Sequence, residues 1–328
     1  MTSLKGQKVL VTGATGFVGG ALVHHLVAEG AEVYALVRRS GRDAYIKDLD
    51  QVHLVEGNLK DQSSLELSLK GIDLVYHVAA ALGGSYAHQK EVNVTGTSNL
   101  VQACLNQGVQ RLIHISSIAV YGYQIPATLV TEATPLNPGT VAYNRTKAEA
   151  EAVIQASSLD VTVVRPGIIY GPRSNFWTKT AFKFINRPFT LFVGDGSGLA
   201  PTIFIDDLCR LLILCATNPA AIGQIFIAVD EPAPTWREFL QAYANLKGGP
   251  NRWLALPKWL VSAGAFLIDQ IQNRKGDPIE ALNLLHYATT KRQFSHQHAT
   301  QKLGWQPQIT IETGTQMCSD YLIKEGLL

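Results

Sequence analysis

Three side chains in the middle of the chain, Ser117, Tyr143 and Lys147, have the chemistry that reduction of a carbonyl group requires. A tyrosine phenol can donate a proton to the carbonyl oxygen when a nearby cation lowers its pKa. Tyr143 and Lys147 stand four residues apart in VAYNRTKAEAEAVI, which places them on one face of a predicted helix. Ser116 and Ser117 end the preceding apolar run, and their hydroxyls can hydrogen-bond a substrate oxygen. The trio predicts an acid/base site for carbonyl or hydroxyl chemistry.

The Tyr-x-x-x-Lys spacing alone carries little weight, because the chain repeats it. The other pairs with this spacing are Tyr86/Lys90, Tyr243/Lys247 and Tyr287/Lys291. Only Tyr143 begins a predicted helix between the apolar runs 111–117 and 161–167, on the side of the sheet where ligands bind. We interpret the other three pairs as contacts on helix surfaces, so position in the fold selects Tyr143.

A glycine-rich segment near the start, TGATGFVGG, indicates a nucleotide site. Gly13, Gly16 and Gly19 follow an apolar run at 8–12 and open a helix predicted over 17–29. Glycines at this spacing allow a tight turn, close approach of the backbone to a pyrophosphate, and close packing of helix on strand. Because the amides at the start of the helix then face the phosphates, the segment predicts a bound dinucleotide.

The end of the second apolar run, 31–37, decides which dinucleotide is expected. An NAD site usually presents a carboxylate to the ribose 2′-hydroxyl, whereas this chain has Arg38 and Arg39 there. Guanidinium groups pair well with a 2′-phosphate, which favours NADP(H). The alternative is that both arginines are ordinary surface charges, and NAD(H) then stays open as the cofactor.

The elements that position these groups alternate along the first half of the chain. Segments with helical periodicity at 62–70, 88–107 and 141–157 separate short apolar runs that read as buried strands. These runs are 8–12, 31–37, 52–57, 72–80, 111–117 and 161–167. Strands that alternate with helices form parallel sheets through right-handed crossovers. We predict an α/β protein with a Rossmann doubly wound parallel sheet, whose ligand crevice lies at the carboxyl ends of the strands.

The character of the sequence changes after Pro166, where aromatic residues and prolines become frequent. We expect a Rossmann domain over 1–165 and a mainly substrate-binding lobe over 166–328. Apolar segments at 202–216 and 223–229 indicate that part of this second half returns to the sheet. The smaller C-terminal substrate lobe is therefore expected to be interleaved with the Rossmann domain.

Composition and charge exclude several classes of protein. Hydrophobic residues make up 46% and charged residues 16% of the 328 residues, which suffices for a large buried core. The net charge of +2, without long runs of like charge, gives no indication of a nucleic-acid partner or of an anionic membrane. The chain runs almost at once into its first predicted strand, without a signal-peptide pattern, so cytoplasmic residence is expected.

Cysteines, histidines and the longest apolar stretch all have plain structural explanations. The cysteines lack metal-ligand spacing, so we expect reduced, mostly buried thiols, and the pair His296/His298 has no third ligand nearby. The stretch 259–268 is too short to span a bilayer. We interpret it as a helix of the second lobe, with a membrane-surface helix as the alternative. No metal, disulfide or membrane partner is predicted.

Together the motifs resemble those of the extended short-chain dehydrogenases/reductases over nearly the full length of the chain. They are TGATGFVGG (12–20), EGNLKD (56–61), HVAA (77–80), NVTGTSNL (93–100), HISSIAVYG (114–122), YNRTK (143–147), RPGIIYGPR (165–173) and LGWQP (303–307). The resemblance implies Ser117 as the catalytic hydroxyl, Tyr143 as the acid/base and Lys147 beside it. It places Asn58 near the adenine and Pro166 at the start of a loop around the nicotinamide. The implied cofactor-binding residues are Gly13, Thr15, Gly16, Phe17, Val18, Asn58, Leu59, Ala79, Ala80, Tyr143, Lys147 and Pro166, in addition to Arg38 and Arg39.

Within that family, sugar-nucleotide epimerases and dehydratases often carry an arginine in a GDGSxxRD-like stretch, where it meets the phosphates of the nucleotide. This chain has GDGSGLAPTIFIDD (194–207), with Ala200 and Pro201 at the positions of that Arg and Asp. The missing cation and a Phe and Trp cluster at 176–192 favour an apolar substrate. In these respects the chain is more similar to the hydroxysteroid dehydrogenase and dihydroflavonol reductase branches.

The favoured function is an NADP(H)-dependent oxidoreductase that interconverts a carbonyl and a hydroxyl on a mainly apolar small molecule. An NAD(P)-dependent sugar-nucleotide epimerase or dehydratase is the alternative. A cofactor-binding protein without catalysis is a third hypothesis, which the intact Ser117, Tyr143, Lys147 trio disfavours. The resemblance also suggests a homodimer through helices 88–107 and 141–157.

Overall fold

A computed structural model of the chain describes residues 3–38, 44–123, 128–187, 189–248, 253–264 and 281–328. Seven parallel strands form the main sheet in the order β11-β7-β5-β4-β1-β2-β3. Their bounds are β1 Lys8–Thr12, β2 Glu32–Val37, β3 Val52–Glu56, β4 Leu74–His77, β5 Arg111–Ile115, β7 Asp160–Pro166 and β11 Ile225–Ala228. Strand order reverses at β1, as in a doubly wound sheet, so the predicted α/β Rossmann class is confirmed.

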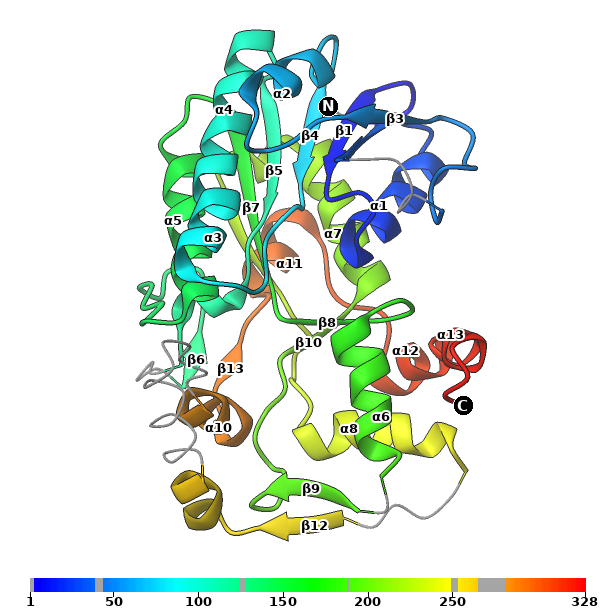
Figure 1. The fold of residues 1–328 in the computed structure, drawn as a ribbon, viewed down its shortest axis with the longest axis vertical. Helices are drawn as coiled ribbons and strands as arrows, with labels where there is room; N and C mark the ends of the chain where they lie inside the picture. The colour runs from blue at the N-terminus through cyan, green and yellow to red at the C-terminus, as the bar shows by residue number, and fades with distance from the viewer. Residues whose placement is uncertain (1–2, 39–43, 124–127, 188, 249–252, 265–280) are drawn as a thin grey trace.

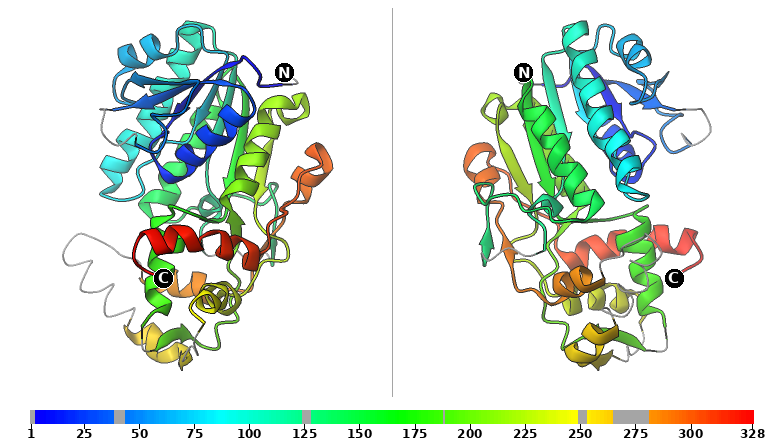
Figure 2. Two further views of the ribbon diagram at one scale, coloured as in Figure 1. Left: turned by 90° about the vertical axis from the view of Figure 1, so that its right-hand side faces the viewer. Right: turned by 60° about the vertical axis from the view of Figure 1, so that its left-hand side comes forward.

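Helices cover both faces of this sheet (Figure 1 and Figure 2). On one face α1 (Phe17–Ala28) and α7 (Ile205–Thr217) pack side by side and bury their apolar side chains in the larger hydrophobic core. On the other face α2 (Gln62–Ser68), α4 (Gly96–Gln107) and α5 (Ala142–Gln155) contribute to a second core. The central strands are covered on both sides, which explains why they read as continuous apolar runs.

The predicted helix before β5 consists of three consecutive segments. α3 (Tyr86–Lys90) passes into a π-helical turn (Glu91–Thr95), and α4 follows directly. Asn93 on this turn exchanges two hydrogen bonds with the main chain of Ala81, at 2.7 and 3.0 Å, and its Nδ2 donates to Thr146 at 3.1 Å. The wider turn thus lets one side chain connect the segment after β4 with α5, a contact that helical periodicity does not reveal.

The second half of the chain builds a smaller lobe beyond the carboxyl ends of the strands (Figure 1). Within it β8 pairs with β10, β9 with β12, and β13 with β6 (Leu129–Val130) in two-stranded parallel sheets. Its elements are β8 Ile168–Tyr170, a π-helical turn Asn175–Thr180, α6 Ala181–Ile185, β9 Thr190–Val193, β10 Thr202–Phe204, α8 Trp236–Leu246, β12 Trp253–Leu256, α10 Ala281–Thr289, β13 Gln293–Phe294, α12 Ile311–Met317 and α13 Ser319–Lys324. The helix α11 (Gln297–Leu303) instead packs against β11 of the main sheet. Since α7 and β11 belong to the main sheet layers, the chain leaves the lobe and re-enters it.

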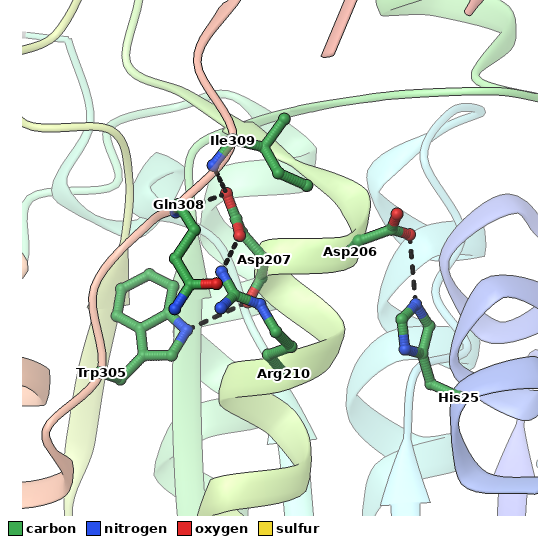
Figure 3. Close-up of polar contacts among 7 residues, drawn as sticks. All are labelled: His25, Asp206, Asp207, Arg210, Trp305, Gln308 and Ile309. Atoms are coloured by element: carbon green, nitrogen blue, oxygen red, sulfur yellow. Dashed lines mark hydrogen bonds and ion pairs between the residues drawn. The ribbon is translucent and has the colours of Figure 1, made fainter. Parts of the chain in front are cut away.

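The carboxylate of Asp207 ties the C-terminal segment to this re-entrant part (Figure 3). Asp207 is fully buried near the start of α7 and accepts hydrogen bonds from the amides of Gln308 and Ile309 at 3.2 and 3.0 Å. The neighbouring Asp206 lies 3.1 Å from Nε2 of His25 on α1. Two adjacent carboxylates therefore connect α7 to the tail of the chain on one side and to the first helix on the other.

Candidate active site

The glycine turn between β1 and α1 has room only for backbone. Gly13 has φ +70, and a Cβ atom there would lie 2.9 Å from Cα of Ala79. A Cβ on Gly19 would lie 2.2 Å from the carbonyl oxygen of Gly13. The N-cap of α1, Gly16, provides no side-chain hydrogen bond to the helix amides. The turn therefore fits a pyrophosphate, because its amides stay available and no side chain fills the cradle.

The remaining residues predicted for the dinucleotide surround this turn. Thr12 holds the turn to the end of β4, because its Oγ1 accepts hydrogen bonds from the amides of Val78 and Ala79, both at 3.1 Å. Ala80 follows and is half-buried. Half-buried side chains also surround the start of α1, at Thr15, Phe17 and Val18.

The adenosine end of the predicted site lies after β2 and β3. Arg38 follows β2 directly and is exposed, whereas Arg39 lies outside the described residues. After β3, Asn58 is exposed and Leu59 is buried. Oδ1 of Asn58 accepts a hydrogen bond from the amide of Lys60 at 3.1 Å. One cation is thus placed at the end of β2, where a 2′-phosphate of a dinucleotide would approach.

The structure brings Tyr143 and Ser117 together. Tyr143 is the second residue of α5, and Ser117 caps the 3₁₀ turn Ile118–Tyr121 by accepting a hydrogen bond from the amide of Ala119 at 3.1 Å. Burial raises the pKa of the Tyr143 phenol, and hydrogen bonding with the Ser117 hydroxyl lowers it to a smaller extent. The pair places two hydroxyl groups where one carbonyl oxygen could accept from both.

Lys147 lies buried one helical turn after Tyr143. Its Nζ donates to the main-chain carbonyl of Ile115 at 2.6 Å. Burial lowers the pKa of Lys147 to about 8, and the carboxylate of Glu151 opposes this shift. The expectation that a cation lowers the pKa of Tyr143 is not met in the cofactor-free chain, because burial dominates and raises that pKa.

Two buried histidines next to Lys147 were missed in the sequence. His77 and His114 are register partners at the ends of β4 and β5, with ring centroids 5.1 Å apart. His77 bridges Thr12 and Thr97, with 2.9 Å to each hydroxyl. Burial lowers the pKa of His77 to about 3 and that of His114 well below its usual value, and Lys147 lowers both further. Both imidazoles are therefore neutral at physiological pH, and only their places in HVAA and HISS hinted at them.

A buried ion pair fixes α5 against β7. Arg165 on β7 donates to Glu151 on α5, at 2.6 Å from Nη2 and 3.0 Å from Nε. Nη1 of Arg165 also donates to the hydroxyl of Tyr121 at 2.6 Å. Because Tyr121 ends the 3₁₀ turn that Ser117 caps, this network positions both sides of the candidate site.

The segments after Pro166 differ in part from expectation. Pro166 ends β7, and β8 begins two residues later, so the expected loop around the nicotinamide is reduced to Gly167. A Cβ on Gly167 would lie 2.0 Å from the carbonyl oxygen of Pro201. Ala200, which precedes Pro201 in the sequence, is fully buried. Ala200 and Pro201, which stand where sugar-nucleotide epimerases often carry Arg and Asp, thus bring no cation to this place.

The predicted aromatic cluster at 176–192 divides between core and surface. Phe182 and Phe192 belong to the hydrophobic core, whereas Phe176 and Phe189 are exposed. Trp177 is half-buried, and its ring begins a series of contacts with rings from other segments. The ring centroids are 5.7 Å apart for Trp177 and Trp236, 5.9 Å for Trp236 and Tyr287, and 5.8 Å for Tyr287 and Tyr123.

This aromatic series, Trp177, Trp236, Tyr287 and Tyr123, reaches the candidate site. Tyr123 lies close enough to Tyr143 to raise the pKa of its phenol. All four rings of the series are half-buried. Nε1 of Trp236 is buried without a hydrogen-bond partner among the described residues. Sequence reasoning missed the series because its rings come from four separate segments.

The other Tyr-x-x-x-Lys pairs are not uniform surface contacts. Lys90 lies 5.8 Å from the ring centroid of Tyr86, which is a helix contact as interpreted. Tyr243 instead is fully buried, and its hydroxyl lies 2.8 Å from Oγ1 of Thr178. Tyr287 belongs to the aromatic series. The interpretation as a surface contact is therefore wrong for Tyr243, because the face of α8 that carries this residue packs in the core.

The remaining predicted features are accounted for individually. All four cysteines are buried free thiols. His296 lies 3.0 Å from the carbonyl of Val229 and His298 lies 2.9 Å from Oε1 of Gln224, so the two imidazoles serve different contacts. Within the described ranges no group of His, Cys, Asp and Glu side chains could hold a metal ion. In the same ranges no helix combines the length and apolarity needed to cross a bilayer.

Comparison with known proteins places these features in a family. Residues 9–228 match the model of the NAD dependent epimerase/dehydratase family. The chain is 33% identical to sterol demethylase protein B of Methylococcus capsulatus, over 81% of this chain and 82% of the relative. It is 30% identical to 2-alkyl-3-oxoalkanoate reductase of Stenotrophomonas maltophilia, over 94% and 97%. UDP-glucose 4-epimerase of Vibrio cholerae is 29% identical over 94% and 93%.

Solved structures agree on the fold. The crystal structure of gox2253 superimposes with a TM-score of 0.83 at 25% identity, covering 98% of this chain and 99% of that one. UDP-glucose 4-epimerase of Thermotoga maritima gives a TM-score of 0.76 at 21% identity, covering 97% and 99%. The family match and the names of the relatives identify the chain as an NAD(P)-dependent oxidoreductase of the extended short-chain dehydrogenase/reductase type. The chain belongs to the NAD-dependent epimerase/dehydratase family.

Proposed function

We propose that this enzyme is an NADPH-dependent reductase that interconverts a carbonyl and a hydroxyl group on a mainly apolar small molecule. The observation that carries the proposal is the Tyr143 and Ser117 pair at the carboxyl end of the sheet, with Lys147 buried one helical turn behind it. The aromatic series begins beside this pair at Tyr123.

Different residues of the chain would bind the cofactor, orient the substrate and transfer the proton. The amides of the Gly13 to Gly19 turn would hold the pyrophosphate, and Arg38 would pair with the 2′-phosphate. A bound nicotinamide dinucleotide supplies the hydride that the carbonyl carbon receives. The Tyr143 phenol donates its proton to the carbonyl oxygen, which becomes the hydroxyl, and Ser117 holds that oxygen by a hydrogen bond. The Lys147 ammonium stabilises the phenolate that remains until solvent returns the proton.

The apolar nature of the substrate is supported by two observations. The four half-buried rings of the aromatic series offer apolar and π surface to a ligand that extends away from Tyr143. The buried Ala200 offers no charge to a diphosphate. The names of two relatives, sterol demethylase protein B and 2-alkyl-3-oxoalkanoate reductase, agree with such a substrate. We infer that the substrate is a ketone on a hydrocarbon body.

A sugar-nucleotide epimerase remains the second candidate, favoured by the likeness to UDP-glucose 4-epimerase over 94% of this chain. In an epimerase the cofactor is reduced and reoxidised within one turnover, so no NADPH is consumed. The purified enzyme should be mixed with NADPH and offered 3-ketosteroids, 2-alkyl-3-oxoalkanoates, or UDP-glucose. We expect stoichiometric NADPH oxidation with an apolar ketone. Conversion of UDP-glucose without NADPH consumption, together with no activity on ketones, would favour the epimerase.

We further propose cytoplasmic residence and a homodimer through the outer faces of α4 and α5. Four buried free thiols are typical of a reducing compartment. Cell fractionation tests the first proposal, and sedimentation velocity tests the second. A monomer at micromolar concentration, or enzyme recovered outside the cell, would contradict them.

A further inference from the structure

The end of the lobe farthest from the main sheet presents an apolar surface. We define the lobe tip as β9 (Thr190–Val193), β12 (Trp253–Leu256) and residues 257–264, which lie together at the bottom of Figure 1. In the parallel register of the two strands, Leu191 pairs with Leu254. Register partners point to the same face of a sheet, so these two leucines form one apolar pair. Both are exposed.

The opposite face of the two strands is used by the core. Thr190 and Phe192 alternate with Leu191 and are buried, and the ring of Phe192 lies 4.9 Å from that of Trp253. The outward face therefore has no partner among the described residues. Its large apolar side chains and those next to it have these exposed fractions: Trp259 72%, Phe189 52%, Leu254 48%, Leu260 48% and Leu191 41%. So many large apolar side chains at one end of a protein mark an interaction surface rather than scattered exposure.

Charge identifies the partner. The segments 176–193 and 247–264, which meet at the β9 and β12 pair, contain six Lys and Arg and no Asp or Glu, although the whole chain is nearly balanced at +2. One of the six, Lys179, is paired with Glu325 at the end of α13. Lys183, Arg187 and Lys258 are exposed. The carboxylate nearest after β9, Asp195, accepts a hydrogen bond from the amide of Ser197 at 2.9 Å. The lobe tip is thus both apolar and locally cationic.

We propose that the lobe tip docks on the surface of an anionic lipid bilayer. Tryptophan prefers the boundary between headgroups and hydrocarbon, where its amphipathic ring is partly buried, and exposed leucines beside it gain from the same transfer. Lys and Arg around the apolar side chains are attracted to anionic headgroups. The lobe tip rests on the surface without spanning it. The positive charge around the lobe tip therefore supports a membrane partner, which the nearly balanced charge of the whole chain did not indicate.

The test is sedimentation of the purified full chain with vesicles of phosphatidylcholine, with or without phosphatidylglycerol. Binding is expected to the anionic vesicles, to weaken with added salt, and to be much weaker on phosphatidylcholine alone. Brominated lipids should quench fluorescence of the wild type, and Trp259→Phe should remove most of that quenching. The double variant Arg187→Glu, Lys258→Glu should reduce binding to anionic vesicles by about tenfold or more.

Matched controls separate docking from loss of fold. Leu67→Ser and Lys70→Glu change exposed side chains in and after α2 of the Rossmann domain and should leave vesicle binding unchanged. Leu254→Ser should reduce binding while NADPH oxidation with a soluble ketone stays at the wild-type rate. Equal vesicle binding by the wild type and the double variant would overturn the proposal. So would a lipid-free dimer that the Leu254→Ser variant dissociates, since a second copy would then cover the lobe tip.

Discussion

Nζ of Lys147 donates to the main-chain carbonyl of Ile115 at 2.6 Å, so the ammonium is held at the end of β5 with two neutral imidazoles nearby. The site therefore keeps a buried cation in place before any cofactor arrives. Such a cation costs folding free energy in the cofactor-free chain, because burial lowers the pKa of Lys147 to about 8. That cost is measurable.

We expect Lys147→Met to raise the free energy of unfolding of the cofactor-free chain at pH 7 by about 1–2 kcal/mol, while turnover is lost. The folded-state pKa is about 8 against 10.5 for an ordinary lysine. Below pH 8 the lysine is protonated in both states and the full cost is present. Between these values the unfolded chain binds more protons, so the wild type regains stability as pH rises and the advantage of the variant shrinks. Urea denaturation at pH 7 and 9.5 measures this, with the exposed Lys70→Met as control. A variant less stable than the wild type at pH 7 would contradict the account.

The glycines of the turn should differ in how strongly their substitution by alanine weakens dinucleotide binding. A Cβ on Gly19 would meet the carbonyl oxygen of Gly13 at 2.2 Å, whereas a Cβ on Gly16 would meet it at 3.1 Å. We expect Gly19→Ala to weaken NADPH binding by about a hundredfold or more, and Gly16→Ala to weaken it less. Calorimetric titration with NADPH measures both, and Gly264→Ala, whose Cβ would meet no atom of the described residues within 4 Å, is the control. Unchanged affinity in Gly19→Ala would show that the dinucleotide binds elsewhere.

Arg38 should set the preference between the two dinucleotides. A charge-assisted contact with the 2′-phosphate is worth about one to two powers of ten in affinity, so Arg38→Asp should reduce kcat/KM with NADPH by that factor and spare NADH. Steady-state rates with both cofactors give the comparison. Arg237→Asp removes another exposed arginine in the lobe and should change neither rate constant. If Arg38→Asp keeps the wild-type ratio, Arg38 does not contact the 2′-position.

The contacts of Asp207 predict that its removal destabilises the fold more than removal of the adjacent Asp206 does. Asp207→Ala leaves the part-buried amides of Gln308 and Ile309 without their acceptor and removes the ion pair with Arg210, which together should cost about 2–4 kcal/mol. Asp206→Ala removes only a partly exposed contact with His25 and should cost less than about 1 kcal/mol. Thermal unfolding followed by circular dichroism compares the two. Equal losses would mean that the tail is not fixed through Asp207.

The main sheet was predictable because its central strands are buried on both faces and therefore read as apolar runs. The glycine turn was predictable because the spacing of its glycines reflects backbone contacts within one short segment, such as Gly19 against Gly13. Ser117 and Tyr143 also lie near one another in the sequence, separated by the 3₁₀ turn and β6. Local sequence thus sufficed for the Rossmann half, whereas the roles of Ser117, Tyr143 and Lys147 stay a prediction.

The parts that sequence reasoning missed depend on contacts between distant segments. Tyr287 was noted only for its spacing to Lys291, yet its ring lies between those of Trp236 and Tyr123. Asn93 gains its contacts because a π-helical turn interrupts the periodicity. Tyr243 was misplaced because the inward face of α8 is set by packing against α6 and α12. No spacing rule in one segment reports such packing.

The most direct measurement compares Tyr143→Phe with the wild type on an apolar ketone. If Tyr143 is the proton donor, kcat should fall by about a thousandfold while the dissociation constant for NADPH stays the same. Tyr34→Phe is the matched control, because that phenol donates to Glu32 at 2.8 Å on β2 and its loss should leave kcat unchanged. Wild-type kcat in Tyr143→Phe would contradict the central claim.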